Sequence, residues 1–144
     1  ASLKGEFFLT EAINILLERG AMIKTMRSDV WLDAGIPASL LETNRYLLDH
    51  GRCNCDYHHT KEGVTIIEPV SIPASVVLKS AVIGPHVTLG EGCDLENVVL
   101  RDSIIEAGTR IKDMVIESSI IGRDVILEGR PERLNIGDNS WMTR

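Results

Sequence analysis

The sequence predicts a mainly β fold, a parallel β-helix of six-residue repeats, preceded by a short α/β segment. Between Val70 and Leu127 an aliphatic residue recurs every five or six positions, each two positions after a small or β-branched residue. The aliphatic column is Ile72, Leu78, Ile83, Leu89, Leu95, Leu100, Ile105, Ile111, Ile116, Ile121 and Leu127. Three successive steps lead from Ile72 to Leu89, and three more lead from Leu89 to Ile105. Three such steps make one coil of a three-sided β-helix.

The repeat fits short strands joined by tight turns, because a step of five or six matches neither a helix face nor one long alternating strand. Residues one coil apart, such as Leu89 and Ile105, should stack in continuous apolar ladders. An antiparallel domain with short strands is the alternative, but it would not keep three ladders in register. Glycines and prolines are expected near the corners. The rhythm breaks after Leu127, so 130–133 are expected to form a loop, and about four coils are predicted within 64–144.

Residues 1–52 do not follow the repeat and predict two helices with short strands. The first helix has an apolar face and ends at Gly20; the second opens at Pro37, a residue favoured at the first helical position, and ends near Gly51. The apolar residues of the two helices are Leu9, Ile13, Leu16 and Leu17, and Leu40, Leu41, Leu47 and Leu48. Short strands are expected at 22–26 and 30–32. Residues 53–63 are expected to be a polar linker before the β-helix of 64–144.

The composition of the chain indicates which classes of binding partner are not expected. The chain has 144 residues, 15 basic and 21 acidic side chains and a net charge of −6, with no clustered basic patch, so nucleic acid is not expected as a partner. No stretch is long and apolar enough to span a membrane, and no secretory signal opens the chain. Three cysteines do not suggest a disulfide framework. A cytoplasmic location without a membrane partner is therefore expected.

Three motifs in order resemble the sugar-1-phosphate nucleotidyltransferases. They are GEFFLTEAI at 5–13, WLDAGIP at 31–37 and LLETNRYLL at 40–48. In the branch that is similar to glucose-1-phosphate thymidylyltransferase, a left-handed β-helix follows such a helix directly. The segment RPERLNIGD at 130–138 resembles the end of such a β-helix. The resemblance covers nearly the whole chain.

The resemblance implies an enzyme that joins a nucleoside triphosphate to a sugar-1-phosphate. The family's glycine-rich GxGTRL loop is not in this sequence, and Glu11 and Ile36 replace the usual aspartate and threonine. The chain is therefore expected to be the C-terminal part of a larger enzyme, inactive by itself, with its β-helix serving assembly or regulation in a homo-oligomer. A purely structural oligomerisation module and a hexapeptide-repeat acyltransferase are the alternatives.

Asp33 matches, by this resemblance, a family aspartate that helps to hold Mg²⁺ beside the phosphates. Carboxylates together with substrate oxygens suit that ion. The alternative is a carboxylate that caps the turn before Gly35. Because the partner ligands are not in this sequence, Mg²⁺ is expected in the larger enzyme, and no cofactor is expected in this chain.

The segment after the second helix carries four residues of zinc-ligating types. Cys53, Cys55, His58 and His59 are chemically sufficient for Zn²⁺. Their C-x-C-x-x-H-H spacing is poor, because structural zinc sites draw on two separated ligand pairs. A polar linker with incidental cysteines is the preferred interpretation.

His86 follows Gly84-Pro85 at a predicted corner. A histidine can act as the general base of acyl transfer in hexapeptide-repeat enzymes. A lone corner histidine is more often a solvated turn residue, and no second polar group at a fixed offset supports catalysis. Cys93 is expected to be a small core residue. No catalytic residue is assigned within the chain itself.

Overall fold

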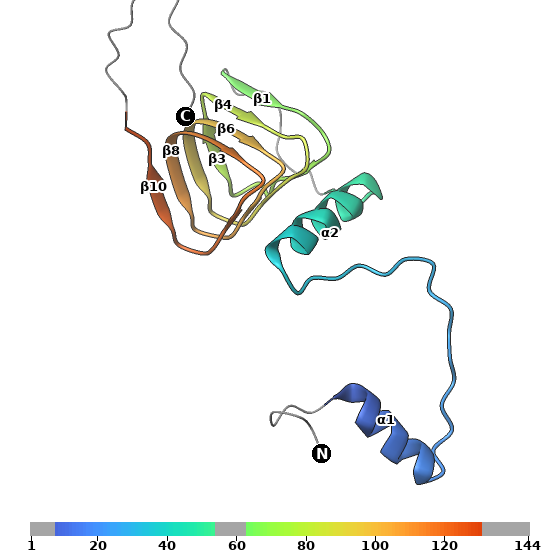
Figure 1. Cartoon of the computed structure of the whole chain (residues 1–144). Helices are drawn as coiled ribbons and strands as arrows, with labels where there is room; N and C mark the ends of the chain where they lie inside the picture. The colour runs from blue at the N-terminus through green and yellow to red at the C-terminus, as the bar shows by residue number, and fades with distance from the viewer. Residues whose placement is uncertain (1–7, 54–62, 131–144) are drawn as a thin grey trace, which may run out of the picture. The chain divides into compact units, whose positions relative to one another are not determined.

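The computed structural model describes residues 8–53 and 63–130 (Figure 1). The chain divides into two compact units, Ala1–Trp31 and Leu32–Arg144. The first unit contains helix α1, and the second contains helix α2 and all of the strands. The boundaries predicted at 52 and 63 remain a prediction. Neither described helix has the length and hydrophobicity needed to cross a membrane.

Helix α1 (Leu9–Glu18) forms where the apolar periodicity predicts it. It ends at Arg19 and Gly20, and Gly20 has a φ of +80° that suits glycine. None of its residues is buried by the described part of the chain. Leu9 is 77% exposed and Leu17 is 51% exposed. The helix is therefore confirmed, and no described residue of its own unit buries its apolar face.

The short strands predicted before the second helix are not present. Residues 21–36 contain no strand, although all of them are described. A short extended segment becomes a strand only by hydrogen bonding to a partner. No described segment pairs with 22–26 or 30–32, so the prediction of strands there was wrong.

Helix α2 (Pro37–Asp49) begins at the proline that predicts it. The Ser39 hydroxyl donates to the Ile36 carbonyl at 3.0 Å and accepts from the Ile36 N–H at 3.3 Å, which satisfies polar groups of the first turn. Leu41 and Leu48 are buried, whereas Leu40 and Leu47 are 36% and 42% exposed. Helix α2 therefore buries only two of the four apolar residues that the sequence pattern placed on its face.

The second unit is a parallel β-solenoid, as the repeat predicts. Its strands are β1 (Val64–Ile66), β2 (Val70–Ser71), β3 (Val77–Lys79), β4 (Ala81–Ile83), β5 (Val87–Leu89), β6 (Asp94–Arg101), β7 (Ile104–Ile105), β8 (Arg110–Glu117), β9 (Ile120–Ile121) and β10 (Ile126–Glu128). Every pairing among them is parallel. Figure 1 shows the strands stacked as successive coils.

The pairing register matches the predicted columns. Leu78 pairs with Leu95, Leu95 with Ile111, and Leu127 with Ile111. Each of these pairs is one predicted coil apart in the sequence, and the strands form about four coils. Strands β6 and β8 each contain a corner and contribute to two faces. The antiparallel alternative is excluded, and the fold is consistent with the left-handed β-helix that the resemblance implies. The predicted 130–133 loop lies almost wholly outside the described residues.

The core fills the inside of the coils with the predicted side chains. Its buried members are Val70, Ile72, Val76, Leu78, Ala81, Ile83, Val87, Leu89, Cys93, Leu95, Val98, Leu100, Ile105, Ile111 and Ile116. Two buried hydroxyls are satisfied by backbone groups: Ser103 Oγ donates to Arg101, and Thr109 Oγ1 donates to Gly122. Burial raises the pKa of the Cys93 thiol, in keeping with a core role.

The corners use a left-handed backbone, mostly without glycine. Among the described residues, seven that are not glycine adopt a positive φ: Ser80, His86, Asn97, Asp102, Asp113, Ser118 and Asp124. At Gly84 a side chain is also excluded by the neighbouring backbone, because a Cβ there would lie 1.8 Å from the Ile67 carbonyl oxygen. His86, Asp102 and Ser118 occupy the same corner on successive coils, since the N–H of Asp102 donates to Pro85 and that of Ser118 to Arg101. We call these three residues the docking corner.

Candidate functional site

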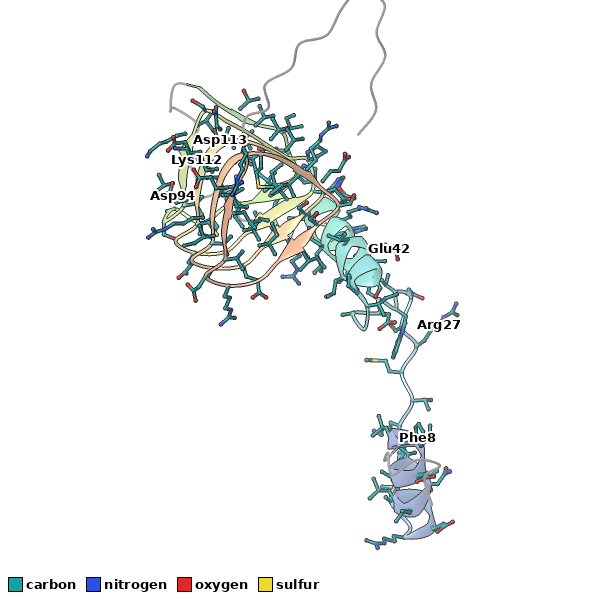
Figure 2. All side chains as sticks on the ribbon, turned by 60° about the vertical axis from the view of Figure 1, so that its left-hand side comes forward. Phe8, Arg27, Glu42, Asp94, Lys112 and Asp113 are labelled. Atoms are coloured by element: carbon teal, nitrogen blue, oxygen red, sulfur yellow. The ribbon has the colours of Figure 1, made fainter. Side chains whose placement is uncertain are left out.

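The most elaborate polar cluster in the described residues joins α2 to the docking corner. Both figures show α2 lying beside the coils (Figures 1 and 2). Leu41 and Leu48 are buried at 7% and 3% exposure. Arg45 lies between them on the same helical face, because residues three or four positions apart are neighbours on a helix. This face therefore combines apolar contact with charge.

Arg45 and Asp102 form a bidentate ion pair at the centre of this contact. Arg45 Nε and Nη2 donate to Asp102 Oδ1 and Oδ2, both at 2.5 Å. The Ser118 hydroxyl donates to Asp102 Oδ2 at 2.8 Å. The hydrogen bond from Arg45 holds the pKa of Asp102 below its ordinary value, and the pKa of Arg45 is raised in return. Paired, planar hydrogen bonds of this kind are among the stronger contacts at a protein surface.

Two further residues of α2 contact the coils beside this pair. Asn44 Nδ2 donates to the His86 carbonyl at 3.2 Å, and Asn44 Oδ1 accepts from Thr88 Oγ1 at 2.6 Å. His86 Nε2 lies 2.8 Å from Asp49 Oδ1. The helix is therefore held through residues 44, 45 and 49 on two neighbouring coils.

Two hollows flank the described solenoid. One, of about 370 Å³, lies between α2 and the coils and is lined by Pro37, Ala38, Leu41, Glu42, Arg45, Ser118 and Ile120. The other, of about 200 Å³, lies over β6, β8 and β10. Beside it Glu96 contacts Lys112 at 3.3 Å and Lys79 at 3.8 Å, one charge on each coil. These two ion pairs link three successive coils.

Asp33 lies in the exposed turn before α2. Its Oδ1 accepts from the Gly35 N–H at 3.0 Å, and its carbonyl accepts from Thr43 Oγ1 at 3.1 Å. This is the geometry of the capping alternative. No group of three potential metal ligands occurs among the described residues. The described residues therefore do not supply three protein ligands to a metal ion, and a metal role for Asp33 remains a prediction.

The other predicted site residues are not brought together by the described structure. Cys53 is exposed, and Cys55, His58 and His59 lie outside the described residues, so the zinc hypothesis is untested. His86 belongs to the docking corner, where one ring nitrogen already faces Asp49. A role of His86 in acyl transfer stays a prediction. Among the described residues, Asp49 is the side chain that the structure places against the His86 ring.

Sequence reasoning missed Arg45 and Asp102, the pair that fixes α2. They are 57 residues apart and belong to no shared motif. One signal was available: His86, Asp102 and Ser118 recur once per coil, although they lie outside the aliphatic columns. In this chain that column of polar residues meets α2.

The chain has relatives among known nucleotidyltransferases. It is 30% identical to the glucose-1-phosphate thymidylyltransferase of Streptomyces griseus over 162 residues, covering 96% of this chain and 46% of that protein. It is 33% identical to the low-salt glycan biosynthesis nucleotidyltransferase Agl11 of Haloferax volcanii, covering 98% and 47%. The bifunctional protein GlmU of Clostridium novyi is 28% identical over 84% of this chain.

No family model matches the chain, and no solved structure matches it significantly. The chain spans less than half the length of the relatives described above, 46% in the case of the Streptomyces griseus protein. The alignments nevertheless include nearly all of this chain, helices and coils together. The chain is therefore homologous to the C-terminal region of sugar-1-phosphate nucleotidyltransferases of the glucose-1-phosphate thymidylyltransferase kind.

Proposed function

We propose that this chain is the C-terminal module of an enzyme that makes nucleotide-sugars. A phosphate oxygen of a sugar-1-phosphate attacks the α-phosphorus of a nucleoside triphosphate. The bond to the β-phosphate breaks, and pyrophosphate leaves as the nucleotide-sugar forms. The observation that carries this proposal is the similarity to the Streptomyces griseus thymidylyltransferase across 96% of the chain.

Within such an enzyme this chain has a supporting role. The solenoid is a rigid stack of coils whose faces serve assembly or regulation. A glycine-rich loop that presents backbone N–H groups to a triphosphate is not part of this sequence. The triphosphate and sugar phosphate therefore bind to another part of the enzyme. Asp33 would contribute a single carboxylate next to them, as one ligand of a Mg²⁺ ion, and that ion would neutralise phosphate charge.

A chimeric enzyme tests this proposal. The aligned segment of the Streptomyces griseus protein is replaced by this chain, and pyrophosphate release is followed with deoxythymidine triphosphate and glucose-1-phosphate. We expect turnover, because the replaced segment keeps its helices, turn and coils. The matched control carries Asp33→Asn, which preserves the shape and the acceptor oxygen of the turn but removes the charge. We expect it to fold and to lose most of the turnover.

The alternative of a purely structural module gives a different result. That alternative is supported by the rigid stack of parallel coils, which a structural module needs and which requires no catalytic residue. A chimera that folds, assembles and binds the triphosphate but releases no pyrophosphate would support it. Equal activity of the parent chimera and its Asp33→Asn variant would remove Asp33 from the proposal while leaving the module itself in place.

A further inference from the structure

The left-handed backbone of the docking corner does not by itself require the side chains found there. His86, Asp102 and Ser118 have φ values of 58°, 45° and 49°. This left-handed region is most accessible to glycine, and asparagine, aspartate and histidine are enriched there among the other residues. Ser80 also adopts it, with a φ of 48°. At the docking corner the side chains make contacts as well: His86 Nε2 lies 2.8 Å from Asp49 Oδ1 of α2, and the Ser118 hydroxyl donates to Asp102 Oδ2 at 2.8 Å.

Helix α2 joins two separate sets of contacts, one with this corner and one with the turn that holds Asp33. Asp102 binds Arg45, and Arg45 stands two positions after Thr43 on α2. Thr43 Oγ1 donates to the Asp33 carbonyl, and Asp33 Oδ1 caps the Gly35 N–H. Asp33 also belongs to the same compact unit as the coils. The turn is thus connected to the solenoid by side chains of one helix.

Helix α2 depends on this contact for its order. It has 13 residues, a length at which an isolated helix is marginal in water. Its end carries no basic residue in the last turn to offset the helix dipole. Docking of Leu41, Leu48 and Arg45 is therefore what keeps α2 formed. If the helix frays, Thr43 leaves the Asp33 carbonyl and the turn loses that restraint.

We propose that the docking corner positions the Asp33 turn through α2, with Arg45 and Asp102 as positioning residues. The restraint of the turn by α2 is inferred from contacts within the chain. The importance of that restraint for catalysis rests on the proposed function, which places Asp33 beside the substrates. The solenoid would then hold one active-site carboxylate in place, in addition to its role in assembly.

Hydrogen exchange measured by mass spectrometry on the whole chain tests this coupling. Asp102→Asn suits the left-handed corner but removes the charge, and we expect exchange in peptides from 38–49 and 32–36 to be about tenfold faster, as for the loss of one charge-assisted hydrogen bond. Arg45→Lys keeps the charge without the paired geometry, so we expect an intermediate increase. Exchange in β4, β5 and β7 should not change.

Asp113→Asn is the matched control. Asp113 has a similar φ of 54° and accepts a hydrogen bond from Asn97 Nδ2 at 2.8 Å. Figure 2 shows it on the side of the coils away from Glu42 of α2. We expect this change to leave exchange in α2 and in 32–36 unaltered.

Two results would overturn the inference. Unchanged exchange in 32–36 after Asp102→Asn would show that the corner does not restrain the turn. Equal acceleration in α2 and in the inner strands would show that Asp102 only stabilises the solenoid. Because no nucleotide is needed, an inactive chimera combined with the expected exchange pattern would refute the proposed function and leave the coupling intact.

Discussion

Replacing Ile105 by alanine is the sharpest test of the stacked core. Ile105 is 1% exposed and pairs in register with Leu89, which is 2% exposed, and with Ile121 on the next coil. The backbone of a coil cannot easily move to fill the cavity that a smaller side chain leaves, because it is hydrogen-bonded to the coils on either side. We therefore expect Ile105→Ala to cost about 3–4 kcal/mol, within the range for buried isoleucine. Ile105→Asp adds an unpaired buried carboxylate and should abolish cooperative folding.

Urea unfolding followed by circular dichroism of the strands measures this cost. Circular dichroism is chosen over tryptophan fluorescence because Trp31 is 90% exposed and belongs to the other compact unit, and the second tryptophan, Trp141, lies outside the described residues. The control is Val115→Asp, an aliphatic-to-acid change at a site that is 75% exposed. We expect it to cost about 1 kcal/mol or less. Similar losses for Ile105→Asp and Val115→Asp would refute the assignment of inward and outward positions.

Four further predictions concern charge, metal, catalysis and assembly. The pKa of Asp102 is lowered in the folded chain, so its carboxylate stabilises the fold above the ordinary pKa of 3.8, and this stabilisation is lost as the pH falls through the folded-state pKa. The difference in unfolding free energy between the parent and Asp102→Asn should therefore vanish in acid. A difference that persists in acid would contradict the ion pair. Cys53→Ser with Cys55→Ser should leave folding unchanged, and elemental analysis of untagged protein should find little zinc; one zinc per chain would reverse our preference. The chain alone should release no pyrophosphate from any nucleoside triphosphate and sugar-1-phosphate, and sustained turnover would contradict this. Light scattering should report a homo-oligomer that Ile13→Glu with Leu17→Glu weakens, because these residues belong to the uncovered face of α1; a monomeric parent at high concentration would oppose an assembly role.

The sequence was most informative where one physical constraint repeats. Every coil must place an aliphatic side chain inside at each face, so Leu95, Ile111 and Leu127 could be aligned without any structure. The corners were less predictable, because several residue types adopt a left-handed φ and only glycine signals it clearly. Asn97 and Asp113, for example, turn corners inside what the structure assigns as single strands.

The docking of α2 could not be predicted, because the contact joins segments that are far apart in the chain. Helical periodicity placed Leu40, Leu41, Leu47 and Leu48 together, but it cannot tell which of them meets a partner. Only Leu41 and Leu48 are buried, since the polar Arg45 between them is drawn to Asp102. Expectations for 22–26 and 30–32 failed for a related reason: a strand depends on a partner that local sequence does not reveal.

If this chain is one module of a nucleotide-sugar-forming enzyme, the coding sequence upstream of Ala1 should encode the rest of that enzyme. Sequencing that region should reveal an open reading frame continuous with Ala1. We expect this frame to encode a glycine-rich loop of the GxGTRL type, followed by a lysine, near its start. An in-frame stop codon shortly before Ala1, or a continuous upstream domain without such a loop, would contradict the claim.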